Sequence, residues 1–337
     1  MNIARIVIVA AALAASTIGV AGRAQNPDEQ TVNLSLSGGA TATGVLRVPS
    51  ATRPPVVFLV TEGDAGALAG ALALERVATL RVTTKSPEVL AQWISFLRND
   101  ERFPLVTVFA EGRDLAAGVI AGRAARADGI ATRGDTSSAA AELTRVVATV
   151  KPIDASSAAD AARQIAAFAR SVPALGRRGS SPTRTLARRS LRHTEMTTIG
   201  GVRVAVEWGQ PQMGGRDIWG ALVPWGAVWM PGADEATVLT TDGAVTIGTV
   251  EVPAGDHTFY TQPTADRFEL LISRDVGVFH TVRNPALIIG RTDMTLNTTS
   301  DSVEGLTFTL RPASDGHTGT LSLSWDKREY GVGLTVR

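Results

Sequence analysis

The chain has 337 residues, with 33 basic and 32 acidic side chains and no cysteine, and its formal net charge is +1. A charge this close to zero argues against a nucleic-acid partner, and the lack of cysteine excludes disulfides, thiol nucleophiles and lipid attachment at a cysteine. The length suffices for about two domains.

Residues 1–24 have the three-part pattern of a secretory signal peptide. A cation at Arg5 precedes an apolar run from Ile6 to Val20, and small residues follow. We expect cleavage before Gln25 and a periplasmic or secreted protein, whose mature chain would carry 31 basic and 32 acidic side chains. The alternative is a retained anchor, in which case the chain would contact a membrane only through this uncleaved segment.

Residues 25–170 have the pattern of an α/β domain. Short apolar runs, typical of strands buried on both faces of a parallel sheet, lie at 54–60, 77–82, 104–110 and 128–132. Helices are expected after the N-cap Ser86, after Asp154, and over "RDLAAGVIAGRA" behind the third run. A β element at 31–49 precedes them. The alternation predicts a three-layer α/β sheet.

Beyond this domain the composition changes. Residues 171–193 are rich in Arg, Gly, Ser and Pro without apolar periodicity, and we expect a basic flexible linker. Residues 194–337 alternate apolar and polar residues over several short runs, as at Val202–Trp208, with frequent turns such as Asp242-Gly243 between two strands. This pattern predicts an all-β antiparallel sandwich or jelly-roll-like domain.

The order of elements over residues 31–172 resembles a shortened α/β-hydrolase of the dienelactone-hydrolase-like or acyl-peptidase-like kind. The segment "WISFLRNDERFP" is similar to the family's helix-to-elbow segment. The resemblance implies that the G-x-S-x-G nucleophile elbow, a sharp turn from strand to helix, falls at Val108, Ala110, Glu111 and Gly112.

This expected elbow lacks its chemistry. Gly112 fits the pattern, but Ala110 has no nucleophilic atom and Val108 places a branched side chain where the first glycine belongs. We therefore predict a pseudoenzyme domain with no catalytic residue. The alternative is an active hydrolase that uses Glu111 or another non-serine group as its nucleophile.

The remaining members of a catalytic triad are also missing. Asp154 lies about where the family's acid would fall, but all four histidines come later in the chain, at His193, His257, His280 and His317. Gly63, Asp64 and Gly66 offer an anion-binding turn without forming a convincing oxyanion loop. Asp234 with Glu235, and Asp256 with His257, carry donor atoms at turns, but adjacent side chains seldom converge on one ion, so we expect no metal and no cofactor.

Residues 211–263 carry the most distinctive motif of the chain. The run "GRDIWGALVPWGAVWMPGADEAT", followed by "VPAG", closely resembles the bacterial domain-of-unknown-function 2911 family, and the resemblance extends from about Thr194 to Arg337. The family's Arg-Thr is replaced by Met230-Pro231, and its Asn by Asp234. The family has no established activity, so the resemblance implies a β-sandwich and no reaction.

Three indoles within this motif form a candidate binding loop. Trp219, Trp225 and Trp229, if exposed, could stack on a glycan or an apolar small molecule. Polar groups that could orient such a ligand lie nearby, at Arg216, Asp217, Asp234 and Glu235. In the competing interpretation the indoles fill the core and Arg216 pairs with Glu235 or Asp234 to hold a long loop.

Together these patterns predict an exported, non-catalytic envelope protein with a binding or structural role. It pairs a pseudo-hydrolase domain with a β-sandwich of unknown function. A carbohydrate-binding module that uses the Trp219–Trp229 loop is a further alternative, beside the active hydrolase.

Overall fold

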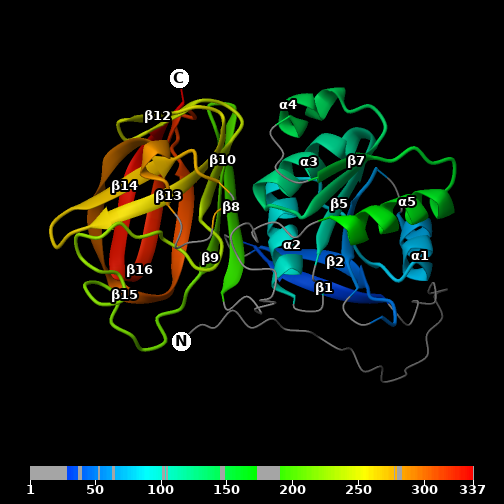
Figure 1. Cartoon of the computed structure of the whole chain (residues 1–337), viewed down its shortest axis with the longest axis horizontal. Helices are drawn as coiled ribbons and strands as arrows, with labels where there is room; N and C mark the ends of the chain where they lie inside the picture. The colour runs from blue at the N-terminus through cyan, green and yellow to red at the C-terminus, as the bar shows by residue number, and fades with distance from the viewer. Residues whose placement is uncertain are drawn as a thin grey trace.

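The protein is described here by a computed structural model covering residues 29–36, 40–51, 54–62, 65–100, 103, 105–144, 149–172, 190–276, 278 and 283–336. The predicted signal segment, Gly63, Asp64 and His280 lie outside this part of the chain. Over the described residues, an α/β domain and a β domain lie side by side (Figure 1). No helix in these residues is long and apolar enough to cross a membrane.

A seven-stranded sheet forms the centre of the α/β domain, in the order β1-β2-β4-β3-β5-β6-β7. Its strands are β1 (Glu29–Ser35), β2 (Thr41–Arg47), β3 (Val56–Val60), β4 (Ala78–Val82), β5 (Val106–Glu111), β6 (Gly129–Arg133) and β7 (Thr149–Pro152). Strands β3 to β7 are parallel, whereas β1 and β2 run antiparallel at one edge. The apolar runs at the centre are buried because helices cover both faces of the sheet.

Helices on the two sides of this sheet complete three layers, as the sequence predicted. The described helices are α1 (Gly66–Leu74), α2 (Pro87–Asn99), α3 (Leu115–Ala124), α4 (Ala140–Leu143) and α5 (Ala158–Ser171), with short 3-10 turns η1 (Gly112–Asp114) and η2 (Ser137–Ala139). Side chains of α1 and α5 form a core cluster on one face, and those of α2 and α3 form another on the opposite face. The Ser86 hydroxyl accepts the N–H of Val89 and caps α2, as expected.

A single nine-stranded antiparallel sheet makes up the β domain, in the order β12-β11-β16-β15-β14-β13-β10-β9-β8. Its strands are β8 (Leu191–Ile199), β9 (Val202–Gln210), β10 (Val238–Thr241), β11 (Val245–Ile247), β12 (Val250–Val252), β13 (Gly255–Pro263), β14 (Phe268–Ser273), β15 (Ile288–Pro312) and β16 (Thr318–Thr335). A 3-10 turn, η3 (Pro285–Leu287), precedes β15.

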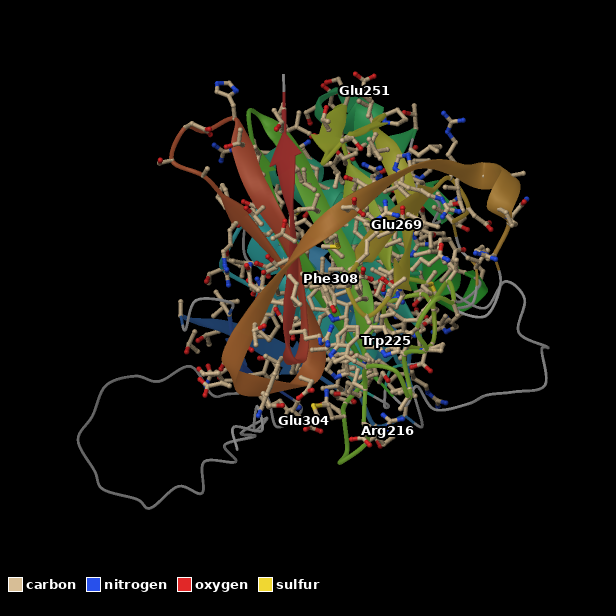
Figure 2. The ribbon with its side chains drawn as sticks, turned by 90° about the vertical axis from the view of Figure 1, so that its left-hand side faces the viewer. Arg216, Trp225, Glu251, Glu269, Glu304 and Phe308 are labelled. Atoms are coloured by element: carbon tan, nitrogen blue, oxygen red, sulfur yellow. The ribbon has the colours of Figure 1, made fainter. Side chains whose placement is uncertain are left out.

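This sheet folds over on itself to enclose one core, which confirms the predicted sandwich-like domain. The register of β15 against β16 shifts on both sides of Val303, so the 25-residue strand bends between the two layers. Its second half brings Phe308 to the centre of the core, with its ring 5.5 Å from Trp208 of β9 and 6.1 Å from Phe259 of β13. Figure 2 shows Phe308 in the middle of the domain.

The Asp242-Gly243 turn differs from the expectation. The two flanking strands are present, but β10 pairs with β9 and β13, whereas β11 pairs with β12 and β16. The turn therefore carries the chain from one side of the folded sheet to the other and does not close a hairpin. Asp242 instead accepts the backbone N–H of Arg203 and pairs with the Arg203 guanidinium at 2.6 Å.

The two domains meet where α2 and α3 pack against β8 and β9 (Figure 1). At the centre, Arg98 of α2 donates to the Glu207 carboxylate of β9 at 2.8 Å, and both side chains are buried. The Asn99 amide exchanges hydrogen bonds with the backbone N–H and C=O of Arg192 at 2.6 and 2.8 Å. Arg123 of α3 pairs with Asp256 of the β domain at 2.7 Å. Buried polar groups of each domain are thus satisfied by the other.

The segment predicted to be a linker contributes to elements at both of its ends. Ser171 is the last residue of α5, and Leu191–His193 belong to β8, so the ordered β domain begins three residues before the predicted boundary at Thr194. Residues 173–189 lie outside the described part of the chain.

Candidate functional site

The turn that follows β5 is the position at which an α/β-hydrolase would display its nucleophile. Strand β5 continues through Glu111, and the residue that leaves it is Gly112, with a φ of 61°. Ala110 lies within the strand, is fully buried and pairs with Val60 and Thr132. Ala110 is therefore not at the turn but two residues before Gly112, which also has no nucleophilic atom, and a G-x-S-x-G motif aligned on this turn would place its first glycine at Ala110.

With the motif aligned on Gly112, its first glycine falls at Ala110 and no longer at Val108. The packing of β5 against α3 explains why alanine is tolerated at this position. A Cβ added to Gly118 of α3 would lie 2.6 Å from the Ala110 Cβ, which is far inside contact distance. The contact has room for one methyl group, and the strand carries it here. The helix can approach the strand because its own residue at this point is glycine.

A carboxylate from the neighbouring loop fills the space in front of the turn. Glu62, two residues after the end of β3, accepts the backbone N–H of Arg113, and a Cβ on Gly112 would lie 2.5 Å from the Glu62 Oε1 atom. In a serine hydrolase of this fold, the N–H after the nucleophile belongs to the oxyanion hole. The hydrogen bond from the Arg113 backbone lowers the pKa of Glu62, since it stabilises the charged form.

The other charged side chains at this edge of the sheet are also paired. Lys85 forms an ion pair with Asp114 at 2.8 Å and donates to the backbone carbonyl of Thr61. Glu111 accepts the Nε–H of Arg133 at 2.7 Å, which neutralises its charge. The side chain proposed as an alternative nucleophile is thus held through its Oε2 atom by a cation on the adjacent strand.

The remaining triad partners are not assembled. Asp154 follows β7, near the place expected for the acid of a triad. No histidine occurs before His193 in the sequence. His193 stacks on Trp208 in the β domain at 5.5 Å, and burial lowers its pKa. His257 is buried in β13, where burial likewise lowers its pKa. Both imidazoles belong to the β domain and neither lies in the α/β sheet.

A second candidate site lies on the loop between β9 and β10. The Trp219 and Trp225 indoles stack with their ring centroids 6.2 Å apart. Trp219 also makes edge contacts with the Phe268 and Tyr330 rings. Trp225 is 36% exposed. The guanidinium of Arg328 lies 5.2 Å from the Trp225 ring and 5.8 Å from the Trp219 ring. We refer to Trp219, Trp225 and Arg328 as the aromatic ledge.

The third indole and Arg216 have separate surroundings. Trp229 is half-buried and stacks on Trp325 at 6.0 Å, while its backbone pairs with Thr261. Arg216 is exposed, and its Nε–H donates to the Met213 carbonyl at 2.9 Å. Figure 2 shows Arg216 at the same end of the domain as Trp225. The three indoles therefore do not all follow one of the two interpretations. Trp225 is exposed, as a binding loop would require, whereas Trp219 and Trp229 are partly buried against the core.

Asp234 and Glu235 face the interface between the domains. Arg192 pairs with Glu235 at 3.5 Å, and Asp234 accepts the backbone N–H of Ser190 at 3.2 Å. Asp234 has a φ of 62°, a conformation that aspartate adopts more readily than most residues. The expectation that Arg216 pairs with either acid is wrong, because Arg192 holds the loop instead. These two acids are not part of the aromatic ledge.

The extent of the motif and the all-β fold together point to one family. Residues 190–334 match the DUF2911 family, described as proteins of unknown function. The resemblance expected from the tryptophan-rich motif is therefore confirmed for the β domain. No curated protein matches the chain in sequence.

The fold of the region before the DUF2911 domain resembles those of solved hydrolases. A cold-adapted esterase from an Arctic intertidal metagenomic library shares 14% identity at a TM-score of 0.31, over 38% of this chain and 71% of that one. A dienelactone hydrolase from Anabaena variabilis shares 14% at 0.27, over 42% and 95%. An esterase domain from a Rhodothermus marinus protein shares 19% at 0.26, over 31% and 49%.

Sequence reasoning missed Glu62 and Arg328, which the structure adds to the two candidate sites. Glu62 lies in the loop where an oxyanion hole was sought, and a carboxylate two residues after the end of β3 was the available signal. Arg328 is far from the DUF2911 motif in sequence and reaches the indoles only because β16 runs past Phe268 and Trp219. No local pattern could have placed it there. The described residues contain no group of three or more His, Cys, Asp or Glu side chains that could hold a metal ion.

Proposed function

We propose that this protein is an exported, non-catalytic binding protein, with an α/β domain that acts as a scaffold and a β domain that carries the ligand site. The observation that supports this most directly is the turn after β5. Gly112 offers no nucleophile, and the Glu62 carboxylate accepts the N–H of Arg113 that an oxyanion would need. Nucleophilic attack, the first step of serine-hydrolase catalysis, therefore has no group to carry it out at this turn.

The size of the deficit argues against residual hydrolysis. In a serine hydrolase the loss of one triad member removes most of the rate acceleration, and what remains comes from the oxyanion hole and substrate binding. Here the nucleophile and the histidine are both absent, and a carboxylate occupies the anion-binding donor. A developing negative charge would meet the negative charge of Glu62 at that point.

The binding role is assigned to the aromatic ledge. Trp225 presents an exposed indole, and the partly buried Trp219 supports it from the core side. An exposed indole with a rigid support is a suitable platform for a sugar ring, whose C–H face packs on the aromatic face. We propose carbohydrate as the class of ligand.

Export rests on the pattern of residues 1–24, whose cation and apolar run are typical of a cleaved signal. The location is tested during preparation of the protein. The full chain is expressed in a Gram-negative host, the periplasm and medium are separated from the cytoplasm, and the N-terminus of the recovered protein is sequenced. A sequence that begins at Gln25 is the expected result, and intact Met1 in the membrane fraction contradicts export.

The catalytic question is tested on this material with generic aryl esters of short acyl chains. We expect no turnover above buffer for the wild-type protein or for Glu111→Ala, because Glu111 is already paired with Arg133. Turnover by the wild-type protein that disappears in Glu111→Ala would establish the alternative hydrolase. An Arg163→Ala variant, with its substitution on the exposed side of α5, serves as the matched control for preparation artefacts.

A further inference from the structure

The aromatic ledge contains hydrogen-bond donors that the protein does not use. Arg328 donates from Nη1 to the Tyr330 hydroxyl at 2.9 Å, and a guanidinium has five N–H donors in a planar fork. Within the described residues, no carboxylate forms an ion pair with Arg328, and the indole N–H of Trp225 has no protein acceptor. The ledge therefore combines a half-buried cation that has no carboxylate partner in the described residues with an indole that is 36% exposed.

Two other arginines of the β domain, Arg267 and Arg192, have carboxylate partners. Arg267 pairs with Asp293 at 2.6 Å and Arg192 with Glu207, both through carboxylates supplied by the protein. Arg328 instead lies over two indole rings, where the aromatic quadrupole partly replaces an anion. An anionic group from outside the protein would complete its coordination with a charge-assisted, bidentate contact.

We propose that the aromatic ledge binds a carboxylated sugar, such as a hexuronate unit of an acidic glycan. The C–H face of the sugar packs on the exposed Trp225 indole, and its carboxylate accepts N–H donors of Arg328. The 5.2 Å separation between the guanidinium and the Trp225 ring lets one sugar unit contact both. This inference rests on the proposed binding function and narrows its ligand class.

The strand register extends the apolar part of this surface. Leu296 of β15 lies directly opposite Tyr330, so both side chains leave the same face of the sheet. Leu296 is 43% exposed, although its neighbour on that face, Met294, is buried. The core thus opens to solvent beside Tyr330. Glu304 lies at this end of the domain (Figure 2). Its carboxylate is already engaged, because it accepts the Gly214 N–H at 2.7 Å.

The test compares a charged and a neutral sugar of the same stereochemistry. Trigalacturonate and galactotriose are titrated into the full chain while tryptophan emission is recorded, with calorimetry as a second readout. We expect trigalacturonate to change the emission and to bind at least about tenfold more tightly than galactotriose, as expected for a charge-assisted contact. Added salt should weaken the binding of the charged sugar only.

Two variants assign the contacts. Arg328→Gln should reduce the affinity for trigalacturonate to that for the neutral sugar, and Trp225→Ala should abolish the emission change for both. Arg311→Gln, which removes an exposed cation at the other end of β15, is the matched control and should bind as the wild-type protein does. Far-UV circular dichroism confirms that each variant is folded.

The outcomes separate the two proposals. Equal binding of both sugars, unchanged in Arg328→Gln, overturns the assignment to a carboxylated sugar while leaving carbohydrate binding in place. Binding of galactotriose alone has the same meaning. If neither sugar binds to the folded wild-type protein, this inference fails, and a panel of neutral glycans of other stereochemistry that also shows no binding overturns the proposed carbohydrate function.

Discussion

The carboxyl edge of the α/β sheet and the aromatic ledge of the β domain differ in how completely the protein satisfies its own polar groups. At the edge, Glu62 accepts an N–H of the turn, and Lys85 and Glu111 each have an opposite charge as partner. At the ledge, Arg328 has aromatic neighbours and one hydroxyl acceptor. The comparison teaches that the charged groups at the edge of the α/β sheet find partners within the protein, whereas Arg328 at the ledge has no carboxylate partner in the described residues.

The largest effect is expected at the interface between the two domains, because its charged groups are buried and paired like those at the edge of the α/β sheet. Glu207 lies between Arg98 and Arg192, and all three side chains are buried. Glu207→Gln would leave two buried cations without their shared anion, and we expect it to lower the free energy of unfolding by about 3–5 kcal/mol. Urea unfolding followed by circular dichroism measures this.

The matched control is Glu251→Gln, at an exposed position on β12. Its unfolding free energy should stay within about 0.5 kcal/mol of the wild-type value, as is usual for surface substitutions. A Glu207→Gln protein as stable as this control would show that the interface contributes little and that the two domains are joined mainly by the chain.

A substitution at the turn after β5 tests whether the edge is closed by Glu62. In Gly112→Ser the new side chain would need a φ near 61° and would meet the Glu62 carboxylate, so we expect a loss of about 1–3 kcal/mol. Adding Glu62→Ala should recover part of this loss, because it removes the collision. Thermal unfolding of the two single variants and the double variant measures the coupling.

Strict additivity of the two single effects would contradict the contact between Glu62 and the turn. Neither variant should hydrolyse aryl esters, since the α/β domain still has no histidine. Ester turnover in the double variant would show that the edge is closer to a working site than its charge pairing indicates.

The smallest expected effect is the pH dependence of stability. Burial alone would raise the pKa of Glu207, but the guanidinium groups of Arg192 and Arg98 outweigh it and lower the pKa to about 2. Because the folded pKa lies below the ordinary value of 4.5, the stabilisation is complete above about pH 4.5 and is lost as the pH falls toward 2.

The slope from this one group is at most about 1.4 kcal/mol per pH unit. Urea unfolding at about pH 5, 4 and 3 checks the trend, and Glu207→Gln should show a shallower decline than the wild-type protein. Parallel declines in the two proteins would mean that other carboxylates dominate acid unfolding.

Local patterns were enough to predict the buried strands, the capped α2 helix and the tryptophan motif of the β domain. Periodicity could place the turn after β5 only approximately, since an apolar run does not mark the residue that leaves the strand. Gly112 was the better signal, because glycine adopts a positive φ without steric penalty. The elbow prediction placed Ala110 at a turn that Gly112 makes, and neither residue carries a nucleophilic atom.

Contacts between distant segments could not be predicted from the sequence. Arg98 and Glu207 are 109 positions apart, and Trp219 and Trp325 are 106 positions apart at their hydrogen bond. A motif shows which residue types are present, but which charges find partners is decided by packing of α2 on β8 and by the course of β16. For this reason the sequence suggested that Arg216 pairs with the acids of the loop. In the structure Arg192 pairs with Glu235, and Arg328 lies over the indole rings.

The single methyl group shared by Ala110 and Gly118 constrains the order in which this protein can change. Alanine at both positions would place two Cβ atoms 2.6 Å apart, whereas glycine at both leaves only a methyl-sized gap. A lineage that moves the methyl from strand to helix must therefore pass through the double-glycine form. The contact thus accepts a methyl group from the strand or from the helix but not from both, and this limit depends on packing alone.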